Sequence, residues 1–158
     1  MKPHAAGPGH RLVYLYPGEL VASAGPCAVT TVVGSCIAVF LWDGLRRQGG
    51  MNHFLLPHPV AQQTASPRFG TVAIRDLLAR LAAIGSRPCD LTGRLFGGAH
   101  LAIAPGPCGP TLGEQNAALA KELLGAAGVI VISAEVGGTR GRRVACDTDD
   151  GSFSVREL

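Results

Sequence analysis

Short apolar runs alternate with polar breaks that contain glycine and proline along most of the chain. Runs of this length that are rich in β-branched and aromatic residues are typical of β-strands rather than helices. We expect strands at residues 12–16, 28–33, 36–42, 51–56, 91–96, 129–136, 143–147 and 152–156, with 129–136 as a buried strand. The last two runs flank Asp149-Asp150-Gly151 and predict a closing hairpin.

Two other stretches have the spacing of amphipathic helices. Apolar residues recur every three or four positions from Phe69 to Ile84, and Gly85 ends the pattern. The stretch Thr111-Leu112-Gly113-Glu114 matches the capping box S/T-x-x-E, which starts a second helix that we expect to run to Leu124. Strands and helices that do not alternate regularly predict a mixed α/β (α+β) fold.

The run that starts with Cys36 and the run that contains His53 lie on either side of a polar, glycine-rich break, and together they predict a β-hairpin. With Asp43-Gly44 at the centre of a two-residue loop, Cys36 lies opposite Met51 and diagonally across from His53, on the same face. A longer loop that shifts the register by two residues places Cys36 directly opposite His53. Only a shift by one residue moves the two side chains to opposite faces.

Cys36, in the sequence Gly34-Ser35-Cys36, and His53 are 17 positions apart and are the main candidates for chemistry. A free thiol has a pKa of about 8.5, so a nearby imidazole is needed to take its proton and make it a nucleophile at neutral pH. The same imidazole can return a proton to a leaving group. However, a cysteine in an apolar strand is more often a buried structural residue, and the spacing alone leaves both interpretations open.

The composition is that of a globular protein. The chain has 158 residues, of which 47% are apolar and 16% charged, and it contains no repeat or clear linker. We expect one domain over residues 11–158, preceded by a short disordered lead at residues 1–10. This lead lacks the apolar core of a signal peptide, and no apolar run approaches the ~18 residues of a membrane span. We therefore expect a cytoplasmic protein without membrane insertion.

The cysteine pattern argues against metal and disulfide chemistry. The five cysteines include no C-x-x-C pair, and Pro57 between His53 and His58 prevents these histidines from sharing a helix face. We therefore expect no metal site, no cofactor and a reducing compartment. The net charge of +3 comes mostly from arginine, for example in the loop at 140–143, and few aromatic residues accompany these arginines. This pattern disfavours nucleic-acid binding and favours an acidic protein partner.

Six short motifs follow one another along the chain. They are Val33–Val39, Gly49–Pro57, Arg68–Gly70, Leu95–Ala99, Gly113–Asn116 and Gly137–Arg142. In this order and spacing they resemble the chemoreceptor glutamine deamidase family, CheD, over about residues 12–153. The resemblance implies a layered sandwich of mixed β-sheets flanked by two or three helices, similar to the catalytic domain of cytotoxic necrotizing toxins.

The resemblance also implies a Cys–His–Thr triad, with Cys36 as the nucleophile and His53 as the base. The threonine of the family precedes the cysteine by six positions, which is Thr30 in this chain. Thr31 is the neighbouring alternative, and since successive residues of a strand point to opposite faces, only one of the two can serve. Gly34 and Ser35 are the expected substrate-binding or oxyanion-supporting residues, because an N–H donor is needed close to the nucleophile.

The implied reaction is the deamidation of glutamine side chains on methyl-accepting chemotaxis receptors to glutamate, with release of ammonia through a Cys36 thioester. The implied partners are the helical bundle of the receptor, as substrate, and a CheC-type phosphatase, and we expect a monomer. The alternative is a non-enzymatic adaptor that binds the receptor or the phosphatase. An adaptor, however, has no need of Cys36.

Overall fold

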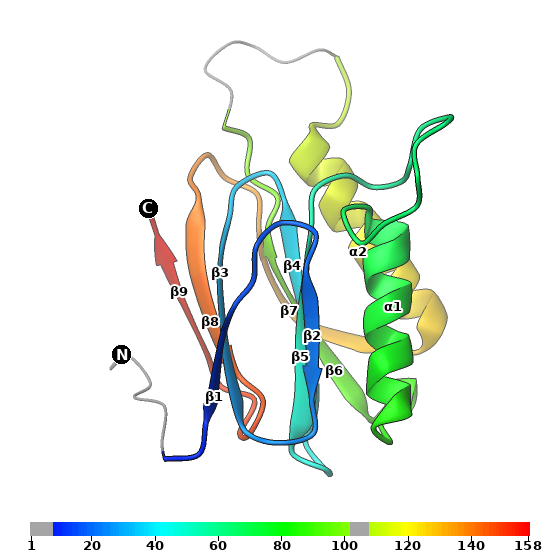
Figure 1. Cartoon of the computed structure of the whole chain (residues 1–158). Helices are drawn as coiled ribbons and strands as arrows, with labels where there is room; N and C mark the ends of the chain where they lie inside the picture. The colour runs from blue at the N-terminus through cyan, green and yellow to red at the C-terminus, as the bar shows by residue number, and fades with distance from the viewer. Residues whose placement is uncertain (1–7, 102–107) are drawn as a thin grey trace.

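Two facing β-sheets and two α-helices form the fold of the structure, a computed structural model that describes residues 8–101 and 108–158 (Figure 1). The four-stranded sheet has, in spatial order, β1 (Arg11–Tyr14), β3 (Cys27–Val33), β8 (Arg142–Asp147) and β9 (Phe153–Glu157). The five-stranded sheet has β2 (Leu20–Ser23), β5 (Gln48–Phe54), β4 (Ile37–Asp43), β6 (Leu91–Gly97) and β7 (Ile130–Val136). The helices are α1 (Gly70–Ala83) and α2 (Leu112–Ala127), and the short 3-10 turn η1 (Pro88–Asp90) precedes β6.

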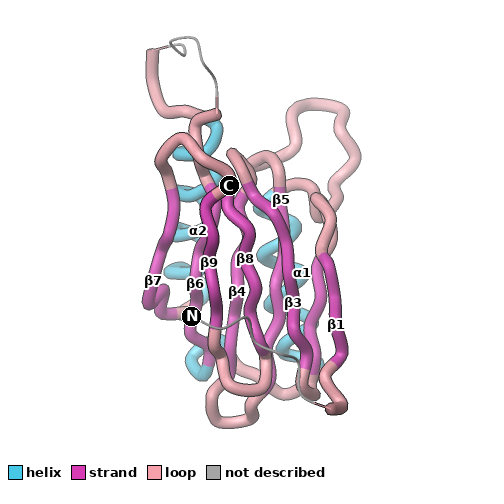
Figure 2. Tube along the Cα trace, turned by 90° about the vertical axis from the view of Figure 1, so that its left-hand side faces the viewer, coloured by secondary structure: helices cyan, strands magenta, loops and turns pink. Residues whose placement is uncertain are grey.

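These elements form three layers, with both helices on one face of the five-stranded sheet and the four-stranded sheet on the other (Figure 2). Side chains alternate along β4, so that Ile37 and Val39 face the helices whereas Ala38 and Phe40 face the second sheet. Because β4 is buried on both faces, its sequence is a continuous apolar run rather than an alternating one. The predicted mixed α/β sandwich is confirmed.

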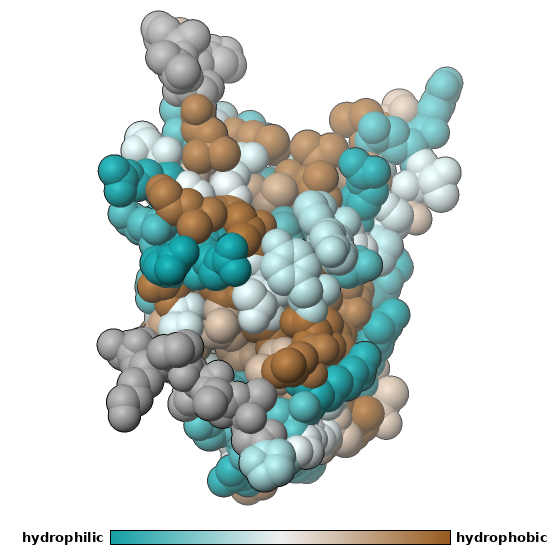
Figure 3. Space-filling view, turned by 60° about the vertical axis from the view of Figure 1, so that its left-hand side comes forward, coloured by the Kyte–Doolittle hydropathy of each residue, from teal (hydrophilic) through white to brown (hydrophobic). Residues whose placement is uncertain are grey.

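The outer face of the four-stranded sheet is not covered by any helix of the described part of the chain. Leu12 and Tyr14 of β1 point to this side and are exposed, whereas Val13 between them packs into the core between the sheets. Apolar and polar patches adjoin on this flank of the molecule (Figure 3). The core between the sheets is therefore enclosed by strands alone, and its upper end in Figure 1 is the part that concerns function.

The hairpin of β4 and β5 has the predicted side-chain faces but not the predicted turn. Trp42 pairs with Gly49, which leaves four residues between Asp43 and Gln48 instead of two. The two-residue turn is thus wrong, and the reason lies in the buried Asp43 carboxylate. It accepts hydrogen bonds from the main-chain N–H groups of Leu45 (3.0 Å) and Arg46 (3.1 Å), which stabilises the longer loop.

Two strands differ from the prediction. β2 was not expected, because its four residues follow Pro17-Gly18 and have no run long enough to indicate a strand. β7 was expected to be buried, but it is the edge strand of its sheet, with Ile130 69% and Ile132 48% exposed. One face of β7 packs towards α2, which accounts for its apolar residues. As an edge strand, β7 pairs with β6 alone, in parallel.

Helix α2 begins as the capping box predicts. The Thr111 hydroxyl accepts a hydrogen bond from the Glu114 N–H, and the Glu114 carboxylate accepts one from the Thr111 N–H at 2.7 Å. The helix continues past Leu124 and ends at Gly128, which has the left-handed backbone (φ 86°) that favours glycine. Its first turn packs against the backbone that follows β6, because Gly113 has no side chain to hold the two apart.

We expect Gly113→Ala to destabilise the protein and Gly125→Ala, in the same helix, to stabilise it. A Cβ on Gly113 would overlap the carbonyl oxygen of Gly98, whereas a Cβ on Gly125 meets nothing within 4 Å. The first change should cost about 1–3 kcal/mol and the second should contribute up to about 1 kcal/mol. Urea unfolding of both variants measures the difference, and equal effects of the two changes would contradict the close packing of α2 on Gly98.

Candidate active site

Three strand ends meet at the upper end of the sandwich in Figure 1: the end of β3, the start of β4 and the end of β5. Cys36 lies in the bend at residues 34–36, which carries the chain from the four-stranded to the five-stranded sheet. His53 is the penultimate residue of β5, and Thr31 lies near the end of β3. Residues distant in the sequence are thus brought to one end of the core between the sheets.

Cys36 and His53 lie on the same face of the hairpin. In the observed register His53 pairs with Ala38, so that Cys36, two positions before Ala38, remains a diagonal neighbour of His53. Cys36 packs against the same core between the sheets as Ala38 and is partly exposed, whereas His53 is 1% exposed. The predicted common face is confirmed, although neither predicted register is the observed one.

The threonine that contacts His53 is Thr31 and not Thr30. The Thr31 hydroxyl lies 2.8 Å from His53 Nδ1 and 2.8 Å from the carbonyl oxygen of Leu15. Burial alternates along β3, so Thr31 is fully buried and faces the core between the sheets, while Thr30 points to the outer face. The expectation that Thr30 lies against the histidine is therefore wrong, because the alternation along β3 turns its side chain away.

The two hydrogen bonds of Thr31 determine the tautomer of His53. A hydroxyl has a single proton, and the Leu15 carbonyl can only accept, so Thr31 donates to Leu15 and accepts from His53 Nδ1–H. The proton on Nδ1 leaves the lone pair of the neutral ring on Nε2. Nε2 is buried and has no hydrogen-bond partner among the described residues, so it is free to accept a proton.

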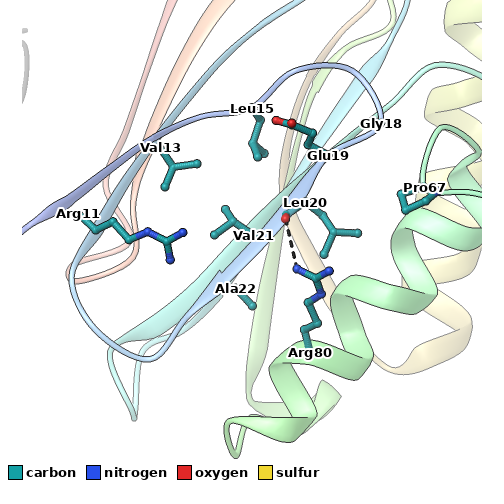
Figure 4. A pocket seen from close by; sticks show the side chains of 10 residues that line it. All are labelled: Arg11, Val13, Leu15, Gly18, Glu19, Leu20, Val21, Ala22, Pro67 and Arg80. Atoms are coloured by element: carbon teal, nitrogen blue, oxygen red, sulfur yellow. Dashed lines mark hydrogen bonds between the residues drawn. The ribbon is translucent and has the colours of Figure 1, made fainter.

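The main chain of His53 is held by the connection between β1 and β2. The His53 carbonyl accepts a hydrogen bond from Gly18 N–H at 2.8 Å, and the His53 N–H donates to the Glu19 carbonyl at 3.1 Å. Leu15, Gly18 and Glu19 also line a groove between the edges of the two sheets (Figure 4). The residues that line this groove do not include the cysteine, histidine or threonine of the site, so the groove borders the site without containing it.

Burial keeps both reactive side chains neutral. It lowers the pKa of His53 from 6.5 to about 4, because an imidazolium would lose its hydration in the core. Burial also raises the pKa of the Cys36 thiol, and the N–H of Cys36 itself opposes this shift only in part. At neutral pH the resting site therefore holds a thiol and a neutral imidazole rather than a thiolate–imidazolium pair.

The carbonyl groups of residues 34–36 all accept hydrogen bonds, from the residues that follow β6 or from α2. Gly34 accepts from Ala99 N–H at 2.8 Å, and Cys36 accepts from Gly98 N–H at 2.9 Å. The Ser35 carbonyl accepts from Asn116 Nδ2 at 3.1 Å. The main-chain hydrogen bonds of the described residues do not use the N–H groups of Ser35 and Cys36.

Two residues at this end of the fold make side-chain contacts that sequence reasoning did not predict. Asn116 belongs to the motif Gly113–Asn116, but no local pattern indicates that its side chain reaches the Cys36 loop. Arg142 was considered as part of a basic loop that contacts a partner. In the structure its guanidinium donates to the carbonyls of Gly97 (3.0 Å) and Gly137 (2.8 Å), where it joins the ends of β6 and β7.

Residues 8–101 and 108–158 contain no group of three or more His, Cys, Asp or Glu side chains placed to hold a metal ion. Among the helices described, none has the length and apolar character needed to cross a membrane.

Comparison with known proteins agrees on one family. A family model described as CheD chemotactic sensory transduction matches residues 55–157. A protein of Anaeromyxobacter dehalogenans, named "Probable chemoreceptor glutamine deamidase CheD 1", is 43% identical over 152 residues, or 96% of this chain and 88% of the relative. Proteins of Trichlorobacter lovleyi and Rhodospirillum rubrum, both named "Probable chemoreceptor glutamine deamidase CheD", are 39% and 40% identical. They cover 89% and 92% of this chain, and the chain covers 87% and 81% of them.

The first of these alignments is long enough to include both Cys36 and His53, which lie before the segment matched by the family model. The model matches more than half of the chain, and the relatives are aligned over most of their length. The chain therefore belongs to the CheD family.

Proposed function

We propose that this protein is a hydrolase that deamidates selected glutamine side chains of chemoreceptors to glutamate. The observation that carries the proposal is the buried imidazole of His53, held at Nδ1 by Thr31 and without a partner at Nε2 among the described residues, on the same face as the partly exposed Cys36. This is the arrangement of a nucleophile, a general base and an orienting group. The names of the relatives supply the substrate class.

In the first step, Cys36 Sγ attacks the carbon of the glutamine side-chain amide. Because the thiol and the imidazole are both neutral at rest, the thiol proton moves to His53 Nε2 as the S–C bond forms. The amide oxygen becomes an oxyanion, which the N–H groups of Ser35 and Cys36 stabilise. Gly34 supports this arrangement, since a Cβ there would lie 2.6 Å from the side chain of Leu101.

In the second step, His53 Nε2–H protonates the amide nitrogen as the C–N bond breaks, and ammonia leaves. A thioester between Cys36 and the substrate remains. Water then attacks the thioester carbon while His53 Nε2 takes its proton, a second oxyanion forms, and the Cys36 thiol leaves with that proton. The products are glutamate and the regenerated thiol, and the sequence requires neither an oxidant nor a cofactor.

Thr31 holds the imidazole in one tautomer and one orientation throughout this cycle. Its hydroxyl accepts from His53 Nδ1–H while it donates to Leu15, so a ring flip or the other tautomer would break a buried hydrogen bond. The proposed third member of the triad is therefore Thr31 rather than Thr30.

The proposed substrate surface is the helical bundle of a chemoreceptor in the cytoplasm. Conversion of glutamine to glutamate adds a negative charge to a helix there and so changes the repulsion between packed helices. A CheC-type phosphatase is the second proposed partner, and the proposed state of the protein is a monomer. None of these assignments is needed for the chemistry of the Cys36 site.

Incubation with a cytoplasmic fragment of a chemoreceptor should increase the mass of that fragment by about one dalton per modified site. The measurement is intact-mass spectrometry, followed by peptide mapping of the modified glutamines. The Cys36→Ala variant should leave the mass of the fragment unchanged. A protein that binds the receptor fragment without any change in mass would instead favour the non-enzymatic adaptor.

Replacement of the two threonines should separate their roles. Thr31→Val keeps the shape of the side chain but removes the acceptor for His53 Nδ1–H, and we expect it to lower kcat about 10²-fold. Thr30→Val, on the outer face of the same strand, should leave kcat within about twofold of the unmodified protein. A loss of activity confined to Thr30→Val would contradict the proposed triad.

The neutral resting state should appear in the pH dependence of Cys36 alkylation by iodoacetamide. Since the thiol pKa is raised and His53 becomes charged only near pH 4, the rate should climb continuously from about pH 6 to above pH 9. The exposed cysteines should first be changed, as Cys89→Ser and Cys108→Ser, so that only Cys36 is followed. A plateau of reactivity between about pH 5 and 7 would reveal a thiolate–imidazolium pair and refute the neutral site.

A further inference from the structure

We propose that Asn116 is a positioning residue that fixes the orientation of the peptide bond between Ser35 and Cys36, and thereby aims the Cys36 N–H at the oxyanion. This inference rests on the proposed function, because it assigns a role to a side chain in that reaction. Asn116 lies on α2, outside the two strands that carry the histidine and the threonine. In the described part of the chain its hydrogen bonds to the site go to main-chain carbonyl groups.

The side chain of Asn116 joins the two halves of the site. It is fully buried, and its Nδ2 group donates to the Ser35 carbonyl at 3.1 Å and to the Leu55 carbonyl at 2.8 Å. Ser35 immediately precedes the nucleophile, and Leu55 comes two residues after His53. One amide group therefore holds the cysteine loop and the end of the histidine strand at a constant separation.

The planarity of the peptide bond links this contact to the oxyanion site. In a trans peptide the C=O of one residue and the N–H of the next point in opposite directions. The hydrogen bond that draws the Ser35 carbonyl towards Asn116 therefore directs the Cys36 N–H away from α2. The same N–H also acts on the Cys36 sulfur, where it opposes in part the rise that burial causes in the pKa of the thiol.

The neighbouring peptide bonds are held in the same sense by main-chain contacts. Ala99 N–H binds the Gly34 carbonyl, and Gly98 N–H binds the Cys36 carbonyl. The Ser35 carbonyl is the one of the three that is held by a side chain. The peptide that supplies the Cys36 N–H is thus the one whose orientation a single substitution can release.

The chemistry of the amide group fixes which way Asn116 points. Both of its partners are carbonyl oxygens, so only the NH2 side of the amide can face them. The other side, Oδ1, is buried without a hydrogen-bond partner in the described part of the chain. An orphaned buried acceptor destabilises the folded protein, so this residue is better explained by a role in positioning than by stability alone.

The test compares a reaction that forms an oxyanion with one that does not. Asn116→Ala removes both donors, and Asn116→Asp keeps the shape but sets a carboxylate oxygen against two carbonyls. We expect each to lower the kcat of receptor-fragment deamidation about 10- to 100-fold with KM within about twofold. Alkylation of Cys36 by iodoacetamide is a direct displacement without an oxyanion, so its rate should change by less than about threefold.

Ser86→Ala is the matched control. Ser86 is also buried and joins two segments, since its hydroxyl donates to Asp43 at 2.6 Å and accepts from Gln48 at 2.7 Å, at the opposite end of the hairpin. The Ser86→Ala variant should unfold at a lower temperature but keep the kcat of the unmodified protein. All rates are measured well below the unfolding temperature of each variant, so that loss of folded protein does not enter the comparison.

Three outcomes would overturn the inference. They are an unchanged kcat in folded Asn116 variants, an equal loss of deamidation and of alkylation, and an equal loss of kcat in Ser86→Ala.

A further measurement separates this inference from the proposed function. Butyraldehyde adds to the Cys36 thiol as a hemithioacetal, with an S–C bond formed and the thiol proton transferred to oxygen, and its binding is read from protection against iodoacetamide.

If the unmodified protein deamidates no receptor fragment, the proposed function fails, but aldehyde binding still tests Asn116. The inference holds if the Asn116 variants bind butyraldehyde at least about tenfold more weakly while their alkylation rate is retained. It fails if the affinity for the aldehyde is the same in the variants and in the unmodified protein.

Discussion

The hydrogen bond between Thr31 and His53 is the contact on which the rest of the site depends. It connects the two sheets across their common core, and its direction is set by the Leu15 carbonyl, which takes the single proton of the Thr31 hydroxyl. The consequence is chemical as well as structural, since it leaves the lone pair of the imidazole on Nε2. A water-exposed histidine would exchange tautomers and orientations freely, whereas this one is held by Thr31 of β3 at its side chain and by the connection between β1 and β2 at its main chain.

A second set of contacts joins the helical layer to the same site. Gly98 and Gly113 let the first turn of α2 approach the backbone beyond β6, and this approach brings Asn116 to the carbonyls of Ser35 and Leu55. The helices contribute no reactive group to the proposed triad. Helix α2 holds the loop that carries Cys36, and the two sheets hold His53. The geometry of the proposed reaction therefore depends on all three layers.

Sequence reasoning succeeded where a local period decides the outcome. Cys36 and His53 share a face in every register that differs by two residues, so an error in the turn did not affect that prediction. The expected contact of Thr30 with the histidine failed because it counted positions from the cysteine, whereas the inward side of β3 is set by packing against the other sheet. β2 and the reach of Asn116 depend on contacts between distant segments, which no local pattern encodes.

A base with a pKa of about 4 is weak for a reaction near neutral pH, and the oxyanion site explains how it can serve. The core disfavours an isolated imidazolium, but in the proposed transition state the imidazolium forms together with the oxyanion on the substrate. Opposite charges created side by side in a medium of low dielectric stabilise one another strongly. In the proposed mechanism the basicity of His53 therefore depends on donors that hold the oxyanion near it. The main-chain N–H groups of Ser35 and Cys36 and the hydroxyl of Thr31 would thus act on one event, the separation of charge as the thiol proton moves.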